Sequence, residues 1–381
     1  MNDRNRKTDT NEIDSRKQPL WYSGRYFDYP LFGIVLGLVL FGLVMVYSTS
    51  SYRADELYGD STYFAKRQLV FELVALVGMF LVSKIDYRRY ARYSKYFLYV
   101  AIALLVLVYI IGSASHGSTR WIYIGAFGFQ PSEFAKLALI VYTADICTRK
   151  PRSLNTIKGL AKMLLLPIIT IVLIAIENLS TAIICFGIVM IIVFVASPKN
   201  WHFILMGVLG ILMCVVFIAT AGYRADRIRI WLAPEKYDDG YQTMQSLYAI
   251  GSGGFFGRGL GNSIQKMGFI PESHNDMIFS VICEELGLFG AVLTIIMFIL
   301  LIYRCTVLAI NSGDRFGGLI AVGVMAHIAV QVLINISVVT NTIPPTGVPL
   351  PFISYGGSSI FFLLLEMGLM FAVARQIKPG R

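Results

Sequence analysis

An aspartate stands directly before a long apolar run in the stretch PESHNDMIFSVICEELG, positions 271–287. A carboxylate at the mouth of a membrane helix is only partly solvated and can accept a proton as a general base. The same position suits a helix cap, in which the carboxylate accepts backbone N–H groups of the first turn. The two roles are compatible, so Asp276 is the first candidate for acid–base chemistry.

The apolar run after this aspartate carries further polar residues. If one helix covers positions 276–287, one face holds four small or polar residues: Asp276, Ser280, Cys283 and Gly287. We expect this face to point toward protein or a cavity and not toward lipid. Glu284 lies to its side and, with Glu272 and His274, is expected to support the aspartate. His274 has no second His or Cys at metal spacing, which argues against a zinc site.

A pair of opposite charges opens another apolar run, FGFQPSEFAKLALIVY at 127–142. Glu133 and Lys136 are three residues apart, so on a helix they share a face and can neutralise each other. One interpretation is a structural ion pair that steadies the helix. The other is a polar cavity in which Lys136 binds an anionic ligand.

The longest segment without an apolar run covers about 222–276 and is basic and rich in glycine. Its cations are Arg224, Arg227, Arg229, Lys236, Arg258 and Lys266. One interpretation is a flexible extracellular loop. The other is a loop whose cations and backbone amides contact a phosphate, as anion-binding backbone nests do.

The last outer loop, TNTIPPTGVPLPFISYGGSS at 340–359, contains four prolines and no Lys or Arg. Such a loop at membrane depth is stable only where it packs on protein or lines a wet cavity. We therefore expect it to be re-entrant, with Gln331 and Asn335 of the preceding run adding a polar edge. His327, one turn earlier, is interpreted as a hydrogen-bonded packing residue.

These candidates need membrane helices to position them, and the composition predicts such helices. The chain is 56% hydrophobic and only 15% charged, with a mean hydropathy of +0.65. Runs of about 20 apolar residues, enough to cross the hydrocarbon layer, recur along it. The sequence therefore predicts an all-α polytopic membrane protein with about ten spans, at 29–49, 67–84, 96–113, 133–148, 160–177, 179–197, 201–221, 277–303, 316–341 and 356–376.

If the N-terminus is cytoplasmic, most of the 33 Lys and Arg residues fall in segments on the cytoplasmic side of the membrane. Cytoplasmic loops carry an excess of Lys and Arg, so this distribution predicts that both termini are cytoplasmic. The expected organisation is a basic tail (1–28), one ten-span domain (29–377) with a large extracellular segment at about 222–276, and a cytoplasmic C-terminus (378–381). The five cysteines show neither disulfide nor metal-ligand spacing.

Three motifs together resemble those of the SEDS family (shape, elongation, division and sporulation), which includes the FtsW, RodA and SpoVE branches. They are GSTRWIYIGAFGFQPSEFAK, GRGLGNSIQKMGFIPESHNDMIFSVICEELG and GVPLPFISYGGSS, and they occur in the family's order. The NSIQK stretch is closer to the FtsW and SpoVE branch than to RodA. One motif departs from the family: IENLS stands where QPDLG is usual, with Asn178 in place of its aspartate.

The resemblance implies a SEDS-type fold and a peptidoglycan glycosyltransferase in the bacterial cytoplasmic membrane. Its substrate would be lipid II, a disaccharide-peptide on undecaprenyl diphosphate, polymerised at the outer face. Asp276 matches the family's essential aspartate, which would deprotonate the attacking sugar hydroxyl, and Arg120 with Trp121 matches its outer RW pair. An inverting single displacement needs no covalent nucleophile. The residues expected to bind substrate are Lys136, Glu133, Arg120, Arg258, Lys266 and Ser358, with His274, Glu284 and Asn335 in support.

The implied partners are lipid II, a class B penicillin-binding protein transpeptidase and other divisome or elongasome membrane proteins, and not nucleic acid. A divalent cation, Mg2+ or Mn2+, is left open, and no organic cofactor is expected. Two alternatives also stay open. A lipid II flippase would move the lipid without catalysis and would not need an acid at the outer mouth, and a non-catalytic protein would serve only as a scaffold for the transpeptidase.

Overall fold

The computed structural model describes residues 27–111, 113–115, 118–124, 127–199, 201–219 and 222–377. Ten helices of 18 residues or more coincide with the ten predicted spans. They are α1 (Tyr29–Tyr58), α2 (Tyr63–Lys84), α3 (Arg88–Ile111), α4 (Pro131–Arg149), α5 (Ile157–Glu177), α6 (Leu179–Ala196), α7 (Trp201–Ala219), α10 (Ile278–Ile310), α11 (Arg315–Val339) and α12 (Gly357–Ala374). Seven of these are both long and apolar enough to cross a membrane. The chain is therefore a helical, multi-pass membrane protein.

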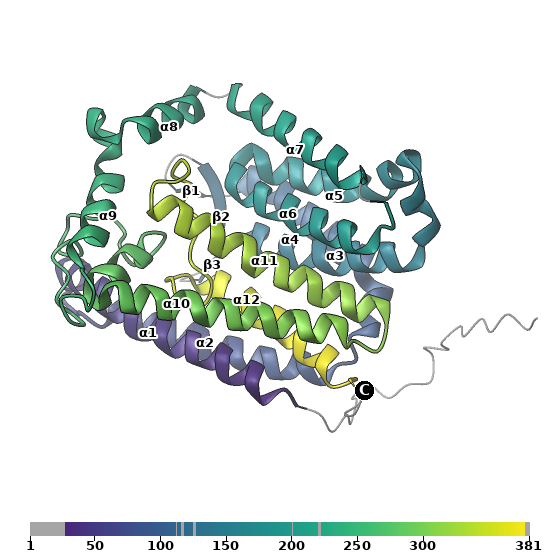
Figure 1. Cartoon of the computed structure of the whole chain (residues 1–381), viewed down its shortest axis with the longest axis horizontal. Coiled ribbons are helices and arrows are strands. Elements are labelled where there is room, and N and C mark those ends of the chain that lie inside the picture. Colours follow the sequence, from purple (N-terminus) through teal and green to yellow (C-terminus); the bar gives the residue numbers. More distant parts are fainter. Residues whose placement is uncertain are drawn as a thin grey trace, which may run out of the picture.

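The long helices form two groups with α11 between them (Figure 1). Helices α1, α2, α10 and α12 lie on one side of the bundle, and α3 to α7 lie on the other. Helix α12 packs along α2, while α11 contacts α10 on one side and α4 and α6 on the other. Polar residues on α11 can therefore reach both groups.

The end of the bundle where α1 begins and α12 ends is held by ion pairs. Asp28 caps α1 and lies 2.9 Å from the Nη2 atom of Arg304 near the end of α10. Asp314 caps α11 and accepts hydrogen bonds from the Tyr87 hydroxyl and the Arg88 Nε, both at 2.8 Å. Both ends of the described chain therefore lie at this end of the bundle. Its assignment to the cytoplasmic side stays a prediction, and the predicted tails 1–28 and 378–381 lie largely outside the described residues.

The opposite end carries a small sheet that the all-α prediction did not include. Strands β1 (Ser113–Ser115), β2 (Ser118–Ile124) and β3 (Phe127–Phe129) pair antiparallel in that order. The stretch STRWIYIGAFGF is rich in aromatic and β-branched residues on both sides of a Gly-Ala pair, a composition that favours a hairpin over a helix.

The segment between α7 and α10 is folded against the bundle. It contains α8 (Gly222–Leu232), α9 (Tyr241–Ser252) and two short 3-10 helices at Pro234–Lys236 and Asp238–Gly240. The Trp231 Nε1 donates to the Asn341 carbonyl at 3.0 Å, and the Ser246 hydroxyl donates to the Val339 carbonyl at 3.1 Å. The segment is therefore attached to the end of α11 and to the loop that follows it, and it contains helices of its own.

Candidate active site

Asp276 lies in the turn that precedes α10, at the end of the bundle opposite the ion-paired end. Helix α10 begins at Ile278 with Met277 at its N-cap position, so Asp276 lies one residue before the cap, and a capping role for its side chain stays a prediction. The main-chain carbonyl of Asp276 accepts a hydrogen bond from the Asn335 side chain at 2.8 Å. Its carboxylate faces Gly347, where a β-carbon would lie 3.8 Å from Oδ2. The half-buried acid is thus held through its backbone while its carboxylate faces the loop after α11.

Helix α10 is interrupted near its start. Gly287 has φ 68° and ψ −164°, a conformation that is not helical. Asp276 precedes the first turn and Gly287 lies at the break, so one regular helix does not cover 276–287. Ser280, Cys283 and Gly287 are nevertheless buried, as expected of a face that points toward protein.

The proline-rich stretch after α11 runs back into the bundle, as its composition predicts. Val348, Leu350, Phe352 and Ile353 are all buried. The stretch packs on Gly42 of α1, where a β-carbon would lie 2.4 Å from the Phe352 carbonyl oxygen. Phe352 has φ 63°, an unusual conformation for a bulky residue, and it is stable only because the surrounding packing imposes it.

Two amides on one face of α11 fasten this re-entrant loop. The Asn335 Nδ2 donates to the carbonyls of Asp276 and Val348, each at 2.8 Å. One turn earlier, the Gln331 Nε2 donates to the Pro349 carbonyl at 2.9 Å. Asn335 therefore ties the turn of Asp276 to the re-entrant loop.

A chain of buried polar side chains continues from Gln331 into the membrane layer. Lys136 lies 2.9 Å from Glu133, which confirms the predicted ion pair, and its Nζ also donates to the Gln331 Oε1 at 3.2 Å. The His327 Nε2 lies 2.8 Å from the same oxygen, and its Nδ1 lies 2.7 Å from the Glu366 Oε2. His327 is therefore a hydrogen-bonded packing residue, as predicted, and a substrate-binding role for Lys136 stays a prediction.

His274 packs between aromatic rings beside the turn that carries Asp276. Its ring centroid lies 4.7 Å from that of Phe64 and 5.5 Å from that of Tyr355. Burial lowers the pKa of His274 to about 4, so the ring is neutral at pH 7. The His274 carbonyl also accepts a hydrogen bond from the Tyr355 N–H at 2.9 Å, which attaches this turn to the re-entrant loop a second time.

Ser358 lies in the first turn of α12. It is buried, and its hydroxyl has no hydrogen-bond partner among the described residues. Its predicted contact with substrate stays a prediction.

Lys266, expected to bind substrate, is enclosed by protein. Its Nζ lies 2.8 Å from Glu285 and 3.1 Å from the Ser48 hydroxyl of α1, and its side chain is 4% exposed. Ser48 also donates to both oxygens of Glu285, at 2.8 and 2.7 Å. The structure thus assigns Lys266 a buried ion pair that joins the glycine-rich stretch to α1 and α10, and a contact with substrate would first have to break this pair.

Glu284 supports the glycine-rich stretch and not the turn of Asp276. It accepts hydrogen bonds from the Ser263 hydroxyl, the Ile264 N–H at 3.0 Å and the Gln265 N–H at 3.3 Å. Arg258, another predicted substrate ligand, lies 3.7 Å from it through Nε and is 38% exposed. A part of the Arg258 guanidinium therefore stays accessible.

The glycines of this stretch permit close contact with the break in α10. A β-carbon on Gly257 would lie 2.2 Å from the Glu285 carbonyl oxygen. The amides of Arg258 and Gly259 donate to the carbonyls of Glu284 and Glu285 at 3.0 and 2.9 Å. These two amides are thus used within the protein, which contradicts the interpretation that they are presented to a phosphate.

Two further cations of the 222–276 segment also have protein partners. Arg229 lies 3.3 Å from Asp226, and the Arg227 Nη1 donates to the Pro345 carbonyl at 3.2 Å. Lys236 is exposed, and the side chain of Arg224 lies outside the described residues. Among the cations of this segment whose side chains the structure describes, Arg227 is thus bound to the loop that faces Asp276.

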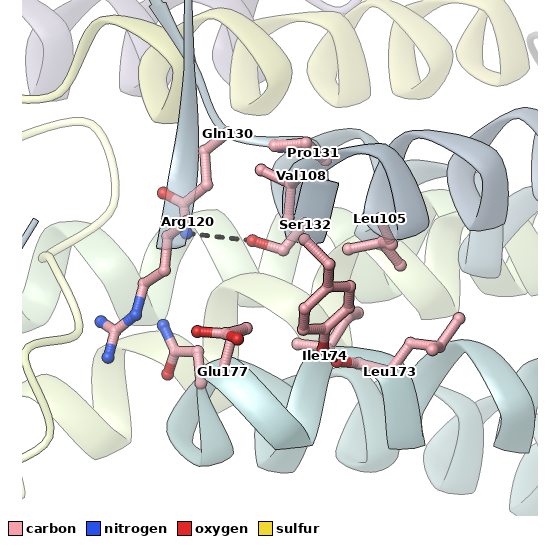
Figure 2. A pocket seen from close by; sticks show the side chains of 11 residues that line it. Leu105, Val108, Arg120, Gln130, Pro131, Ser132, Leu173, Ile174 and Glu177 are labelled. Carbon is pink, nitrogen blue, oxygen red and sulfur yellow. Dashed lines mark hydrogen bonds between the residues drawn. The ribbon is translucent and has the colours of Figure 1, made fainter. Parts of the chain in front are cut away.

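Arg120 lines a pocket between α3, α4 and α5 (Figure 2). The polar side of this pocket also contains Glu177, Asn178, Gln130 and Ser132. The apolar side is formed by Leu105, Val108, Leu173 and Ile174. Arg120 and Glu177 lie on the same side of the pocket. Ser132 directly precedes Glu133 in α4.

Asn178, the residue that departs from the family motif, caps α6. Its side-chain oxygen accepts the Thr181 N–H at 3.1 Å. An aspartate would cap the helix in the same way, so the exchange preserves the local fold and removes a charge.

Sequence reasoning missed three buried acids near these residues. Glu366 is a lone acid within an apolar run, and an ionisable residue at membrane depth is a sufficient signal for a functional candidate. Glu72 of α2 is buried and accepts a hydrogen bond from Gln68 at 3.0 Å. Gln68 in turn accepts the Gly356 N–H at 3.3 Å, next to the re-entrant loop. Glu285 was visible in the sequence, but its partner Ser48 lies too far away in the chain to be identified.

Known proteins are similar in sequence to this chain over most of its length. A family model described as "Cell cycle protein", covering FtsW, RodA and SpoVE, matches residues 29–379. Stage V sporulation protein E of Bacillus subtilis (strain 168) is 40% identical over 348 residues, which are 90% of this chain and 95% of that protein. The probable peptidoglycan glycosyltransferase FtsW of Trichlorobacter lovleyi is 38% identical over 358 residues, 92% of this chain and 94% of that protein.

Solved structures show the same similarity in three dimensions. A chain from a study titled "Structural coordination of polymerization and crosslinking by a peptidoglycan synthase complex" superimposes with a TM-score of 0.78 at 27% identity, covering 93% of this chain and 99% of that chain. The rod shape determining protein RodA of Thermus thermophilus gives a TM-score of 0.69 at 26% identity, covering 94% and 99%. This chain therefore belongs to the FtsW/RodA/SpoVE family and resembles its FtsW and SpoVE members.

Proposed function

We propose that the protein is a peptidoglycan glycosyltransferase that polymerises lipid II at the outer face of the cytoplasmic membrane, in cell division, shape maintenance or sporulation. The observation that carries the proposal is the placement of Asp276. A half-buried carboxylate faces the re-entrant loop, and Asn335 and the backbone of Tyr355 hold its turn in place. The names of the relatives support the same activity.

The chemistry requires a base and a stabilised leaving group. In this proposal Asp276 takes the proton of the attacking sugar hydroxyl, whose oxygen bonds to the anomeric carbon of the donor. The bond to undecaprenyl diphosphate breaks in the same displacement, and the configuration inverts. Cations stabilise the charge that develops on the departing diphosphate. Arg227, Arg258 and Arg120 are our candidates, because they lie at the same end of the bundle as Asp276.

A divalent cation has no protein cage among the described residues, where no group of three or more His, Cys, Asp or Glu side chains could hold one. Mg2+ is commonly held by one or two carboxylates together with substrate phosphates. Any Mg2+ or Mn2+ would therefore arrive on the lipid diphosphate, and no step is assigned to it.

We also propose that the protein works with a class B penicillin-binding protein transpeptidase and that both termini are cytoplasmic. The similarity to a chain from a peptidoglycan synthase complex supports the first point. The excess of Lys and Arg at the ion-paired end supports the second.

The deciding experiment compares the wild-type protein with Asp276→Asn in a polymerisation assay. Purified protein and its transpeptidase are given lipid II, and the glycan strands are resolved on a gel. We expect the variant to make no strands at normal expression, while Asp239→Asn, an exposed acid of the same segment, polymerises normally. Normal strands from Asp276→Asn would refute the catalytic assignment. A protein that moves lipid II without forming strands would instead be a flippase.

A further inference from the structure

The loop 254–269, which lies between α9 and α10, carries large apolar side chains on its outer surface. Phe255 is 61% exposed and Phe256 is 78% exposed, and the centroids of their rings lie 4.9 Å apart in an edge-to-face contact. Four more residues of this loop are large, apolar and exposed: Leu260, Ile264, Met267 and Phe269. An exposed apolar surface of this kind marks a contact with a membrane or with another protein.

The 254–269 loop carries few charges, and these have partners within the protein. Its sequence contains no Asp or Glu. Lys266 is enclosed in its ion pair, and Arg258 lies 3.7 Å from Glu284. The exposed stretch 235–239 of the same segment, EKYDD, has the opposite character, because only its tyrosine is uncharged. One part of the segment therefore suits water, and the other suits an apolar neighbour.

The length of α10 places Phe255 inside the hydrocarbon layer of the membrane. The Phe289 N–H donates to the Phe255 carbonyl at 3.1 Å, so the two residues lie at the same level. Arg304 lies toward the other side of the membrane, where its ion pair with Asp28 belongs at or beyond the edge of the hydrocarbon. Helix α10 is regular between Phe289 and Arg304, so these two residues are at most about 22 Å apart along the membrane normal. The hydrocarbon layer is about 30 Å thick, so Phe255 lies at least about 8 Å within it.

Helix α1 gives an independent measure of the same depth. Asp28 caps the start of α1, and Ser48 lies at most about 30 Å farther along this helix. The Ser48 hydroxyl donates to both carboxylate oxygens of Glu285, just before the break in α10. Glu285 therefore lies near the outer edge of the hydrocarbon layer, and Phe289, beyond the break, lies deeper. Arg258 is bonded to the backbone beside Glu285, close enough to this edge for its long side chain to extend the charge to the headgroups.

The break in α10 gives the loop backbone the partners that it needs at this depth. A helix break leaves N–H and carbonyl groups unpaired, and such groups are costly in hydrocarbon. Here the break and the loop pair with each other: the N–H groups of Leu288, Phe289, Arg258 and Gly259 donate to the carbonyls of Gly254, Phe255, Glu284 and Glu285, in that order. The loop backbone is therefore held on protein, while the side chains of Phe255 and Phe256 stay exposed.

We infer that the 254–269 loop is a membrane anchor whose Phe255 and Phe256 side chains insert among the acyl chains of the leaflet on the Asp276 side. Besides the depth, the continuity of the surface favours lipid as the occupant. On one side, the exposed apolar surface continues along α10 through Leu288, Phe289, Val292 and Leu293. On the other side, a β-carbon on Gly268 would lie 3.7 Å from the ring of Tyr52 on α1, and tyrosine is enriched at membrane–water interfaces.

The anchor also sets the height of Asp276 relative to the lipid. The Ser273 hydroxyl donates to the Thr49 carbonyl at 3.1 Å, and Lys266 lies 2.8 Å from Glu285. The loop and the turn of Asp276 are thus attached to the same ends of α1 and α10. The acid is thereby held near the edge of the hydrocarbon, where the lipid phosphates begin. This consequence for catalysis rests on the proposed function, whereas the insertion of the loop does not.

Fluorine NMR on the full-length protein tests the insertion directly. Trifluoromethylphenylalanine is placed at position 256, 289 or 237, and nanodiscs of phosphatidylethanolamine and phosphatidylglycerol hold one copy of the protein each. Dissolved oxygen concentrates in hydrocarbon and a gadolinium chelate stays in water, so the two relaxation effects report depth. We expect oxygen to dominate at Phe256, as at Phe289, and the chelate to dominate at Tyr237, an exposed aromatic residue of the stretch 235–239.

Each alternative has its own outcome in this measurement. If the chelate affects position 256 as strongly as position 237, the loop lies in water and the inference is overturned. If neither probe reaches position 256, protein covers the loop, which overturns it as well. A protein that makes no glycan would refute the proposed function, while the fluorine data would still decide this inference.

Thermal unfolding in the same nanodiscs gives a second measurement. An amide in hydrocarbon lacks hydrogen-bond partners, whereas a change at an exposed position in water has little effect. We therefore expect Phe256→Asn to lower the melting temperature by several degrees and its matched control, Tyr237→Asn, to leave it nearly unchanged. Phe256→Leu keeps the apolar side chain and should melt like the wild type. Equal melting temperatures for Phe256→Asn and Tyr237→Asn would contradict the inference.

Discussion

Asn335 donates to the main-chain carbonyl of Asp276 at 2.8 Å and, from the same nitrogen, to the carbonyl of Val348 at 2.8 Å. One buried side chain thus fixes the turn that carries the acid and the re-entrant loop that faces it. A second attachment between the turn and the loop is the hydrogen bond from the Tyr355 N–H to the His274 carbonyl.

Replacing this amide by an apolar group of similar size should misplace the acid. In Asn335→Leu, two carbonyls lose their donor, at a cost of about 1–3 kcal/mol for each group that stays buried and unpaired. We expect polymerisation to fall by roughly 100-fold, because a displacement of about 1 Å can have that effect. Strand synthesis and melting temperature in detergent are the measurements. Thr340→Ala, an exposed position just beyond α11, is the control, and equal loss in both variants would contradict the prediction.

A methyl group at Gly42 should displace the re-entrant loop from α1. The new β-carbon would lie 2.4 Å from the Phe352 carbonyl oxygen and 2.7 Å from the Ile353 Cα. We expect Gly42→Ala to destabilise the protein by about 1–3 kcal/mol, as overpacking does, and to reduce polymerisation. Gly33→Ala on the same helix meets no atom within 4 Å and should be neutral or slightly stabilising. Similar melting temperatures for the two variants would count against this packing.

The buried pair of Lys266 and Glu285 should behave as one unit. Lys266→Met leaves Glu285 buried without its cation, which typically costs about 3–5 kcal/mol. The double variant Lys266→Met with Glu285→Gln should recover a large part of this loss. A double-mutant cycle on thermal unfolding measures the coupling. If Lys266 instead serves mainly to bind substrate, the single variant will melt normally and show a raised KM.

His274 should make stability depend on pH below neutrality. Burial lowers its pKa from 6.5 to about 4, so between these values the unfolded chain binds a proton that the folded chain does not. Its contribution is complete above pH 6.5 and is lost as the pH falls toward 4, by about 3 kcal/mol for a shift of this size. His274→Phe keeps the ring contacts and should flatten the melting temperature between pH 4 and 7.

Asp60 provides the control for this titration. Hydrogen bonds from Thr62 and Lys66 lower its pKa to about 2, so Asp60→Asn should leave the profile above pH 4 unchanged. An unchanged slope in His274→Phe would assign the pH dependence to other groups.

The membrane spans could be predicted from the sequence because each span depends only on the residues within it. A run of about 20 apolar residues must form a helix in lipid, whatever it packs against. The ion pair of Glu133 and Lys136 was predictable for the same reason, since three residues on a helix bring the charges together. The proline-rich loop could be identified as re-entrant because its composition permits few other structures at membrane depth.

Contacts between distant segments could not be predicted in this way. Lys266 and Arg258 suggested a site for an anion, but their partners Glu285 and Glu284 belong to a helix whose break is not evident in the sequence. The helix expected from Asp276 onward begins two residues later, at Ile278, and helix boundaries are the least certain part of such predictions. The pairing of Glu366 with His327 could not be predicted, because the two residues lie on different helices.

The interruption of α10 at Gly287 also restricts how chain length can vary in this family. The carbonyls of Gly254 and Phe255 accept the N–H groups of Leu288 and Phe289, while the N–H groups of Arg258 and Gly259 bond Glu284 and Glu285. Any insertion or deletion between 254 and 259 would shift this pairing by a residue and place a side chain where only a glycine fits. Alignments of relatives should therefore be free of gaps here, whereas the exposed stretch 235–239 can change length.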